Sequence, residues 1–352
     1  MPGKSANPRP EQSGLEVVSE ASRGIDTMLS AILRKRSLGR AKRMFAMLEY
    51  FLGFRDEDLK KISARAGKRF RPSLALFLAD AYGSRKQTNS AALAIEIFHN
   101  FTLIHDDIVD RDEKRRGRPT VWKLWGNDHA LNSGDALSLI AAQISLDAEK
   151  SGGNGMGRAL LWSYVEVCKG QYLDFEMAGS PLYKISDKNY LDMIALKTGA
   201  LVSVSAAAPG IAAKKAPAEL RRLRVFGESL GIAYQIADDF RSVWSSEPKT
   251  GKDPLGDIRE RKRNLPAVLA YKSLSGTAKA RLTELYDLDR SLNADEVGEA
   301  KRLIDAAEIQ KPIRAAIHRY ATKAKRSVQS LSIAPKRKHT LERLVDELTD
   351  VA

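Results

Sequence analysis

Three aspartates, Asp106, Asp107 and Asp110, directly follow an apolar run within the stretch from Ser90 to Asp112. Apolar residues recur there at helical spacing, and the stretch contains no Gly or Pro, so the pattern predicts a long buried helix. A separation of four residues places Asp106 and Asp110 on one face of that helix. Like charges one turn apart repel unless a cation lies between them, and carboxylate oxygens are the ligands that Mg²⁺ prefers. The spacing therefore indicates a metal site, with a solvated acidic helix end as the simpler alternative.

A second acidic cluster lies in a helix predicted from about Ala218 to Trp244. Its polar residues stand at relative positions 0, 3, 4 and 7, and they are Gln235, Asp238, Asp239 and Ser242. They share one helix face that emerges from an apolar run. Two such clusters could face each other across one cavity.

Cations crowd the start of a third predicted helix, where Gly67 and Pro72 mark the beginning and Lys68, Arg69 and Arg71 lie between them. Positive charge at a helix N-terminus opposes the helix dipole unless an anion binds there. We therefore expect a phosphate site at this point.

Two further basic segments are predicted to be loops. The segment from Glu113 to Thr120 carries four basic residues within five positions, among them Arg115 and Arg116, and we expect it to fold over bound phosphate. A Gly-, Pro- and Lys-containing flap after the second acidic cluster supplies Lys252 and Lys262.

The triplet Lys197, Thr198 and Gly199 lies inside a helix predicted from about Asp187 to Ala208. A Lys-Thr-Gly sequence within an apolar helix indicates a local break where backbone carbonyls turn towards a cavity.

The elements that would hold these residues are helical throughout, so the predicted fold class is all-α. A chain of 352 residues with 43% hydrophobic content can bury one large core, and we expect a flexible polar leader over residues 1–14 and a single domain over 15–352. The lone Cys168 is expected to be a small core residue. No apolar run long enough to cross a bilayer stands out, which favours a cytoplasmic protein.

The order of these segments resembles the trans-polyprenyl diphosphate synthases over roughly residues 60–270. The matching motifs, in chain order, are GKRFRP, HNFTLIHDDIVD, RRGRPT, GQYLD, KTG, YQIADDF and GKDPLGDIRERKRNLP. The resemblance implies a homodimeric helical bundle around a deep central cavity. It also implies Mg²⁺-dependent condensation of isopentenyl diphosphate with an allylic diphosphate such as the dimethylallyl, geranyl or farnesyl compound.

The resemblance assigns roles to individual residues. The ligands of about three Mg²⁺ ions would be Asp106, Asp110 and Asp238. The cations that clamp the allylic diphosphate would be Arg115, Lys197 and Lys262, with Lys252 close by. The pocket for isopentenyl diphosphate would be Lys68, Arg71, His99 and Arg116. Oxygen dipoles facing the developing carbocation would come from Thr198 and Gln235.

One position departs from the family pattern, because the second motif reads DDFRS and Ser242 replaces the third acid. A hydroxyl is a weaker Mg²⁺ ligand than a carboxylate, so metal binding on that side is expected to rest on Asp238.

Product length is expected to depend on the side chains below the first acidic motif, since the growing chain is apolar and stops where it meets bulk. Phe101 lies five residues before Asp106, and the small Thr102 follows it. One aromatic without an insertion in the motif resembles the C20 geranylgeranyl diphosphate synthases; a farnesyl or longer-chain synthase is the alternative. Ordinary core packing of Phe101 is the alternative, but its position relative to the motif favours Phe101 as the floor that limits chain growth.

Two other classes of protein stay open. A class I terpene cyclase uses the same carboxylates and Mg²⁺ but needs no second diphosphate pocket. A basic helical module for nucleic acid is favoured only by the net charge of +14. The cations are grouped around acids that would repel a polyanion, so we expect no nucleic-acid binding.

Overall fold

The computed structural model describes residues 12–37, 39–63, 67, 69–153, 155–245 and 255–351. Its first half comprises α1 (Gly14–Glu20), α2 (Ile25–Arg36), η1 (Gly39–Ala41), α3 (Lys42–Phe51), α4 (Phe70–Tyr82), α5 (Arg85–Val109), β1 (Lys114–Arg115), β2 (Arg118–Pro119), α6 (Val121–Trp125), α7 (Asn127–Gly152) and α8 (Met156–Ala178). Its second half comprises η2 (Leu182–Lys184), α9 (Asp187–Ile194), η3 (Ala195–Gly199), α10 (Ala200–Ala212), α11 (Pro217–Trp244), α12 (Gly256–Arg259), α13 (Leu265–Ser273), α14 (Gly276–Asp287), α15 (Ala294–Ala306), α16 (Gln310–Gln329) and α17 (Pro335–Thr349). The all-α prediction is confirmed.

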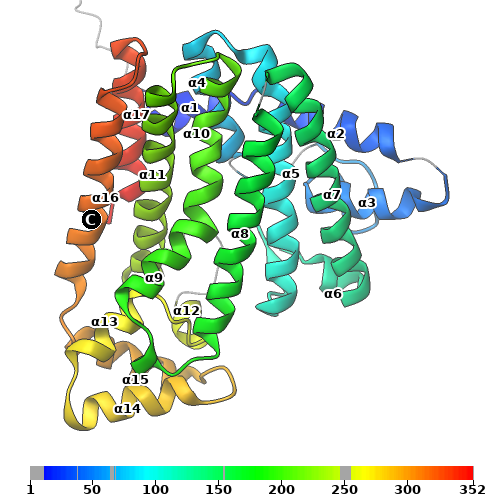
Figure 1. Ribbon diagram of the computed structural model, residues 1–352. Helices are drawn as coiled ribbons and strands as arrows, with labels where there is room; N and C mark the ends of the chain where they lie inside the picture. The colour runs from blue at the N-terminus through cyan, green and yellow to red at the C-terminus, as the bar shows by residue number, and fades with distance from the viewer. Residues whose placement is uncertain are drawn as a thin grey trace, which may run out of the picture.

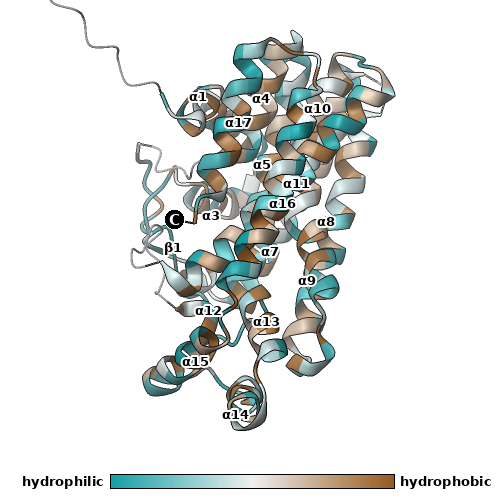
Figure 2. Ribbon diagram, turned by 90° about the vertical axis from the view of Figure 1, so that its left-hand side faces the viewer, coloured by the Kyte–Doolittle hydropathy of each residue, from teal (hydrophilic) through white to brown (hydrophobic). Residues whose placement is uncertain are grey.

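The long helices stand side by side as a bundle, and α13, α14 and α15 form a layer across its lower end (Figure 1). Brown and teal alternate along these helices in Figure 2, as expected of amphipathic helices that bury one stripe each. Apolar side chains of α4, α5, α7, α8 and α10 fill one core region, and those of α9, α11, α13, α15 and α16 fill another. In Figure 1 the C-terminal ends of α5 and α11 both lie toward the lower part of the bundle, where α9 and α12 lie. Both acidic motifs are therefore carried toward the same end.

The structure corrects three expectations. The apolar spacing around residues 15–33 predicts one helix, but the structure has two, because Gly24 adopts a positive φ of 89° between α1 and α2. The basic loop contains a two-residue antiparallel pair, β1 with β2, which is too short to produce an alternating sequence pattern. Cys168 is exposed and does not belong to the core.

The break predicted at Lys197–Gly199 is confirmed as η3, a π-helical turn between α9 and α10. Two neighbouring helices approach this turn at glycines. A Cβ on Gly170 of α8 would lie 2.2 Å from the backbone N of Lys197, and a Cβ on Gly231 of α11 would lie 2.9 Å from the Cα of Gly199. Only residues without side chains allow α8 and α11 to pack so closely on η3.

The continuous helical stretch Asp187–Ala212 is long and apolar enough to cross a membrane by length and composition alone. However, 67% of its apolar window is buried inside the protein. It is the core helix around which α8 and α11 pack.

Candidate active site

The first acidic motif ends α5, and its three aspartates differ in exposure. Asp106 is partly buried, Asp110 is exposed, and Asp107 is only 1% exposed. Asp107 accepts a hydrogen bond from Arg115 Nε at 2.5 Å, while its other oxygen, Oδ2, is buried without a hydrogen-bond partner. Burial raises the pKa of Asp107 to about 7, against the opposing charge of Arg115. Arg115 is thus held at the end of α5 by an aspartate that sequence reasoning did not assign.

Lys197 projects from η3 among carboxylates of two other helices. Its Nζ donates to Oδ2 of Asp174 on α8 at 2.6 Å. Burial lowers the pKa of Lys197, but Asp106 and Asp174 together outweigh burial and raise it above its ordinary value. Burial raises the pKa of Asp106, because it disfavours the charged carboxylate, and the positive charge of Lys197 opposes that shift. The structure therefore brings Lys197 and Asp106 together and adds Asp174, whose GQYLD motif was the sequence signal for it.

Lys262 links α5 to the segment around α12. Its Nζ lies 3.7 Å from Oδ2 of Asp110 and 3.4 Å from Oδ1 of Asp257. Burial opposes the charge of Lys262, yet Asp257 and Asp110 raise its pKa above its ordinary value. Asp257 was not selected from the sequence. Lys252, predicted to lie nearby, is outside the described residues.

The second motif divides between a half-exposed and a buried acid. The side chain of Asp238 is 55% exposed, whereas Asp239 is buried and accepts hydrogen bonds from Tyr190 Oη at 2.6 Å and Gln235 Nε2 at 2.9 Å. Burial and then Asp257 raise the pKa of Asp239 to about 7. Ser242, which replaces the family's third acid, donates to the backbone oxygen of Asp239 at 2.8 Å. Asp238 is accordingly the carboxylate of this motif that solvent reaches.

Thr198 and Gln235, to which the resemblance gives one role, are hydrogen-bonded to each other. Thr198 Oγ1 donates to Gln235 Oε1 at 3.0 Å, which joins η3 to α11. Gly199 and Gly231 set the spacing between these two elements, because a side chain at Gly231 would collide with the backbone of η3.

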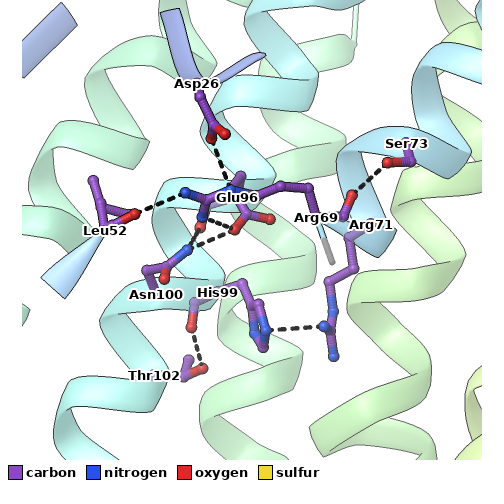
Figure 3. A network of polar contacts seen from close by, with 9 residues as sticks. All are labelled: Asp26, Leu52, Arg69, Arg71, Ser73, Glu96, His99, Asn100 and Thr102. Atoms are coloured by element: carbon purple, nitrogen blue, oxygen red, sulfur yellow. Dashed lines mark hydrogen bonds and ion pairs between the residues drawn. The ribbon is translucent and has the colours of Figure 1, made fainter. Parts of the chain in front are cut away.

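A separate cationic cluster lies between α4 and α5. Arg71 Nη1 lies 3.0 Å from His99 Nε2, and the Nε of Arg71 is buried without a hydrogen-bond partner (Figure 3). Burial lowers the pKa of His99 well below its usual value, and Arg71 and Arg116 lower it further. His99 is therefore neutral and accepts from Arg71. Arg116 comes close to Gly67, since a Cβ there would lie 2.9 Å from Arg116 Cζ. Lys68 is outside the described residues.

Arg69 does not belong to this cationic cluster, although the sequence grouped it with Arg71. Its guanidinium is buried and pairs with Glu96 at 2.7 Å and Asp26 at 3.0 Å, and it also donates to a backbone oxygen at Leu52 (Figure 3). Because its donors already face these acceptors, Arg69 stabilises the packing of α2, α4 and α5 and is not available to a phosphate.

Aromatic rings stack below the first motif. The ring centroid of Phe101 lies 4.9 Å from that of His105 and 5.1 Å from that of Phe98. Phe98 in turn stacks on Tyr164 of α8 at 3.8 Å, an aromatic that the sequence did not indicate. Thr102 Oγ1 donates to the backbone oxygen of His99 at 2.8 Å, so its hydroxyl is turned toward its own helix.

Among the described residues, no three His, Cys, Asp or Glu side chains come close enough to hold a metal ion by themselves. The available donors are hard carboxylate oxygens, and Mg²⁺ usually takes one or two carboxylates together with phosphate oxygens and water. The residues present therefore fit Mg²⁺ only as part of a complex with a phosphorylated substrate.

Acids near the C-terminal ends of two long helices, lysines paired with acids around the first motif, and an arginine beside His99 are the features expected of an all-helical prenyl synthase. The model of the polyprenyl synthetase family matches residues 56–304, and the chain belongs to that family. It is a transferase, specifically a prenyltransferase.

The relatives that this chain resembles are named for two different products. It is 36% identical over 264 residues to a geranylgeranyl diphosphate synthase of Mycobacterium tuberculosis, which covers 74% of each chain. It is 32% identical over 312 residues to a (2E,6E)-farnesyl diphosphate synthase of Mycobacterium bovis, covering 87% of this chain and 86% of the relative. A solved polyprenyl synthetase of Streptomyces coelicolor is 28% identical with a TM-score of 0.82, covering 96% of this chain and all of the other (100%).

Proposed function

We propose that the enzyme condenses isopentenyl diphosphate with allylic diphosphates and releases a C20 product, geranylgeranyl diphosphate. The observation that carries this proposal is the separation of two charged sites. Lys197 and Lys262 stand among carboxylates, whereas Arg71 contacts His99 and forms no ion pair with a carboxylate of the described residues. Two diphosphates with different fates need two such sites, since one must ionise and the other must not.

Asp106, Asp110 and Asp238 would hold Mg²⁺, about three ions in all, together with the oxygens of the allylic diphosphate. When bound, Mg²⁺ would neutralise the leaving diphosphate and so weaken the allylic C–O bond. The repulsion between Asp106 and Asp110, one turn apart on α5, supports a cation at this place.

The cationic side chains hold the leaving group. Lys197 and Lys262 stay protonated because acids surround them, so each can donate to a phosphate oxygen after giving up its present partner. Arg115 presents its guanidinium from β1, anchored by Asp107. Lys252 would add a fourth cation from the flap.

The allylic cation needs oxygen dipoles and a dry environment. Thr198 is buried in η3, and Gln235 is half-buried on the neighbouring helix α11. Their hydrogen bond to each other at this place supports their role as the oxygens that face the cation. After the new C–C bond forms, the released diphosphate would accept the proton that leaves the condensed intermediate. No nucleophile from the protein takes part.

Isopentenyl diphosphate would bind to Arg71, His99 and Arg116 with Lys68. The buried Nε of Arg71 lacks a partner, which supports an anion as its missing acceptor. His99 is neutral, so it adds no positive charge beside the arginines and can accept a hydrogen bond from Arg71.

The C20 length rests on Phe101 as the floor of the chain cavity. The rings of Phe98 and His105 pack against it on α5, and Tyr164 backs Phe98 from α8. A supported ring stops an apolar chain better than an isolated one, because it cannot rotate aside without losing its own contacts. Thr102 adds little bulk beside it.

A homodimer is part of the proposal. Large apolar side chains are exposed along α7 and α8, and they are Leu131, Leu139, Leu146, Trp162, Val165, Tyr172 and Phe175. An exposed apolar face of this extent on two adjacent long helices is typical of a subunit interface. A second copy of the chain would cover it in a cytoplasmic, soluble enzyme whose catalytic domain spans residues 15–352.

The test is to incubate purified protein with Mg²⁺, radiolabelled isopentenyl diphosphate and the dimethylallyl, geranyl or farnesyl primer in turn, and to read product length after dephosphorylation. We expect C20 from each primer and none without Mg²⁺. Cyclic hydrocarbon formed without isopentenyl diphosphate would indicate a terpene cyclase, and a C15 or longer end product would refute the length.

A further inference from the structure

A chain of hydrogen bonds joins helices α9 and α11 to η3, the π-helical turn that carries Thr198. Tyr190 of α9 donates to Oδ2 of Asp239 at 2.6 Å, Gln235 Nε2 donates to Oδ1 of the same carboxyl group at 2.9 Å, and Thr198 Oγ1 donates to Gln235 Oε1 at 3.0 Å. Tyr190 is fully buried (0% exposed), Asp239 is 7% exposed, and Gln235 is half-buried. Tyr190 is therefore the most buried member of the chain, and Gln235 is the most exposed.

The chemistry of each group fixes the direction of the protons along this chain. With Asp239 ionised, both of its oxygens accept hydrogen bonds, so the amide of Gln235 presents its NH₂ group to Asp239 and its oxygen to Thr198. Thr198 then donates its single hydroxyl proton to Gln235. Its remaining lone pairs point away from that bond.

We propose that Tyr190 and Asp239 are positioning residues that hold Gln235 and Thr198 with their oxygen lone pairs, and not their hydrogens, directed to the allylic cation. This inference rests on the proposed function. Neither residue touches the substrate in this scheme. A reversed amide would turn the hydroxyl proton of Thr198 outward, and the positive end of a dipole beside a carbocation is unfavourable in a dry site.

The test compares the binding of two inert analogues, which separates cation stabilisation from diphosphate binding. The first is the allylic thiolodiphosphate, which is uncharged at carbon, and the second is an ammonium analogue carrying a positive charge where the cation develops. Wild-type protein should prefer the ammonium analogue. Tyr190→Phe should reduce that preference by about 3- to 10-fold while leaving thiolodiphosphate affinity within about 2-fold, because only interactions with the charge are lost.

The matched control is Tyr286→Phe, which removes the hydroxyl of another fully buried tyrosine that takes no part in the chain. It should leave the preference unchanged. Thr198→Val removes the outermost hydroxyl and should lose at least as much preference as Tyr190→Phe. In turnover, Tyr190→Phe should lower kcat by the same factor and leave both KM values near wild type.

Equal analogue preference in wild type and Tyr190→Phe would overturn the inference. If Tyr190→Phe fails to fold, as judged by circular dichroism, Asp239→Asn answers the question, because an amide at that position permits both orientations of Gln235 and should lose the preference. Wild-type protein that elongates primers but shows no preference for the ammonium analogue would refute the positioning scheme alone. Absence of any turnover would refute the proposed function.

Discussion

Gly170→Ala places one methyl group where the backbone of α8 contacts the backbone of η3. The new Cβ would lie 2.2 Å from Lys197 N, 2.6 Å from Lys197 Cα and 2.7 Å from Leu196 C. All three are backbone atoms, so no side-chain rotation relieves the contact. Carbon atoms pack at about 3.5–4.0 Å, so α8 and η3 must move apart by about 1 Å or more.

Two opposing effects set the change in stability. Alanine favours a helix interior by about 1 kcal/mol relative to glycine. Overpacking a filled site costs about 1–3 kcal/mol, so the free energy of unfolding should fall by up to about 2 kcal/mol. The effect on kcat should be larger than the loss of stability suggests, because a displacement of about 1 Å at a catalytic group can lower the rate by about 10²-fold. We expect kcat to fall by about that factor as Lys197 moves away from Asp174.

The assay pairs steady-state turnover with thermal unfolding, and Gly179→Ala is the control. Gly179 follows the same helix in a right-handed conformation, and its Cβ would come no closer than 3.6 Å to Phe175 O. That variant should keep wild-type kcat and stability. Wild-type kcat in Gly170→Ala would show that α8 does not set the position of Lys197.

Five other substitutions test separate parts of the site. Asp106→Ala or Asp238→Ala should abolish Mg²⁺-dependent turnover without changing the circular dichroism spectrum, and full activity in either would refute the metal assignment. Arg71→Ala should raise the KM for isopentenyl diphosphate by about 10-fold or more and spare binding of the allylic primer, measured by separate titrations. Phe101→Ala should lengthen the product beyond C20 on reverse-phase chromatography; an unmoved distribution would place the floor elsewhere. Asp107 has a folded-state pKa of about 7, above its unfolded value, so in EDTA the wild type should lose stability relative to Asp107→Asn as pH rises from about 4 to about 7, by urea unfolding.

Helical periodicity was sufficient to predict which acids share a face, because it depends only on residues within two turns. Asp106 and Asp110 on α5, and the break at Lys197, follow from such local spacing. Arg69 shows the limit of this reasoning. It stands two residues from Arg71, yet it pairs with Asp26 and Glu96, which lie 43 and 27 positions away in the chain. Only the tertiary packing of α2 and α5 against α4 separates the structural arginine from the one beside His99.

Residues that act across helices could not be selected for the same reason. Asp257 and Tyr190 were not selected, because the partners that they contact, Lys262 and Asp239, are identified only in the folded structure. The glycines are a sharper case. Within a helical pattern a glycine indicates only weakened propensity, but Gly170 and Gly231 mark the two places where neighbouring backbones press on η3. The π-helical turn carries Lys197 toward α5 and Thr198 toward α11, and helices packed on both sides fix its position. The packing around η3 therefore depends on the absence of side chains at Gly170 and Gly231, which the motif letters alone do not indicate.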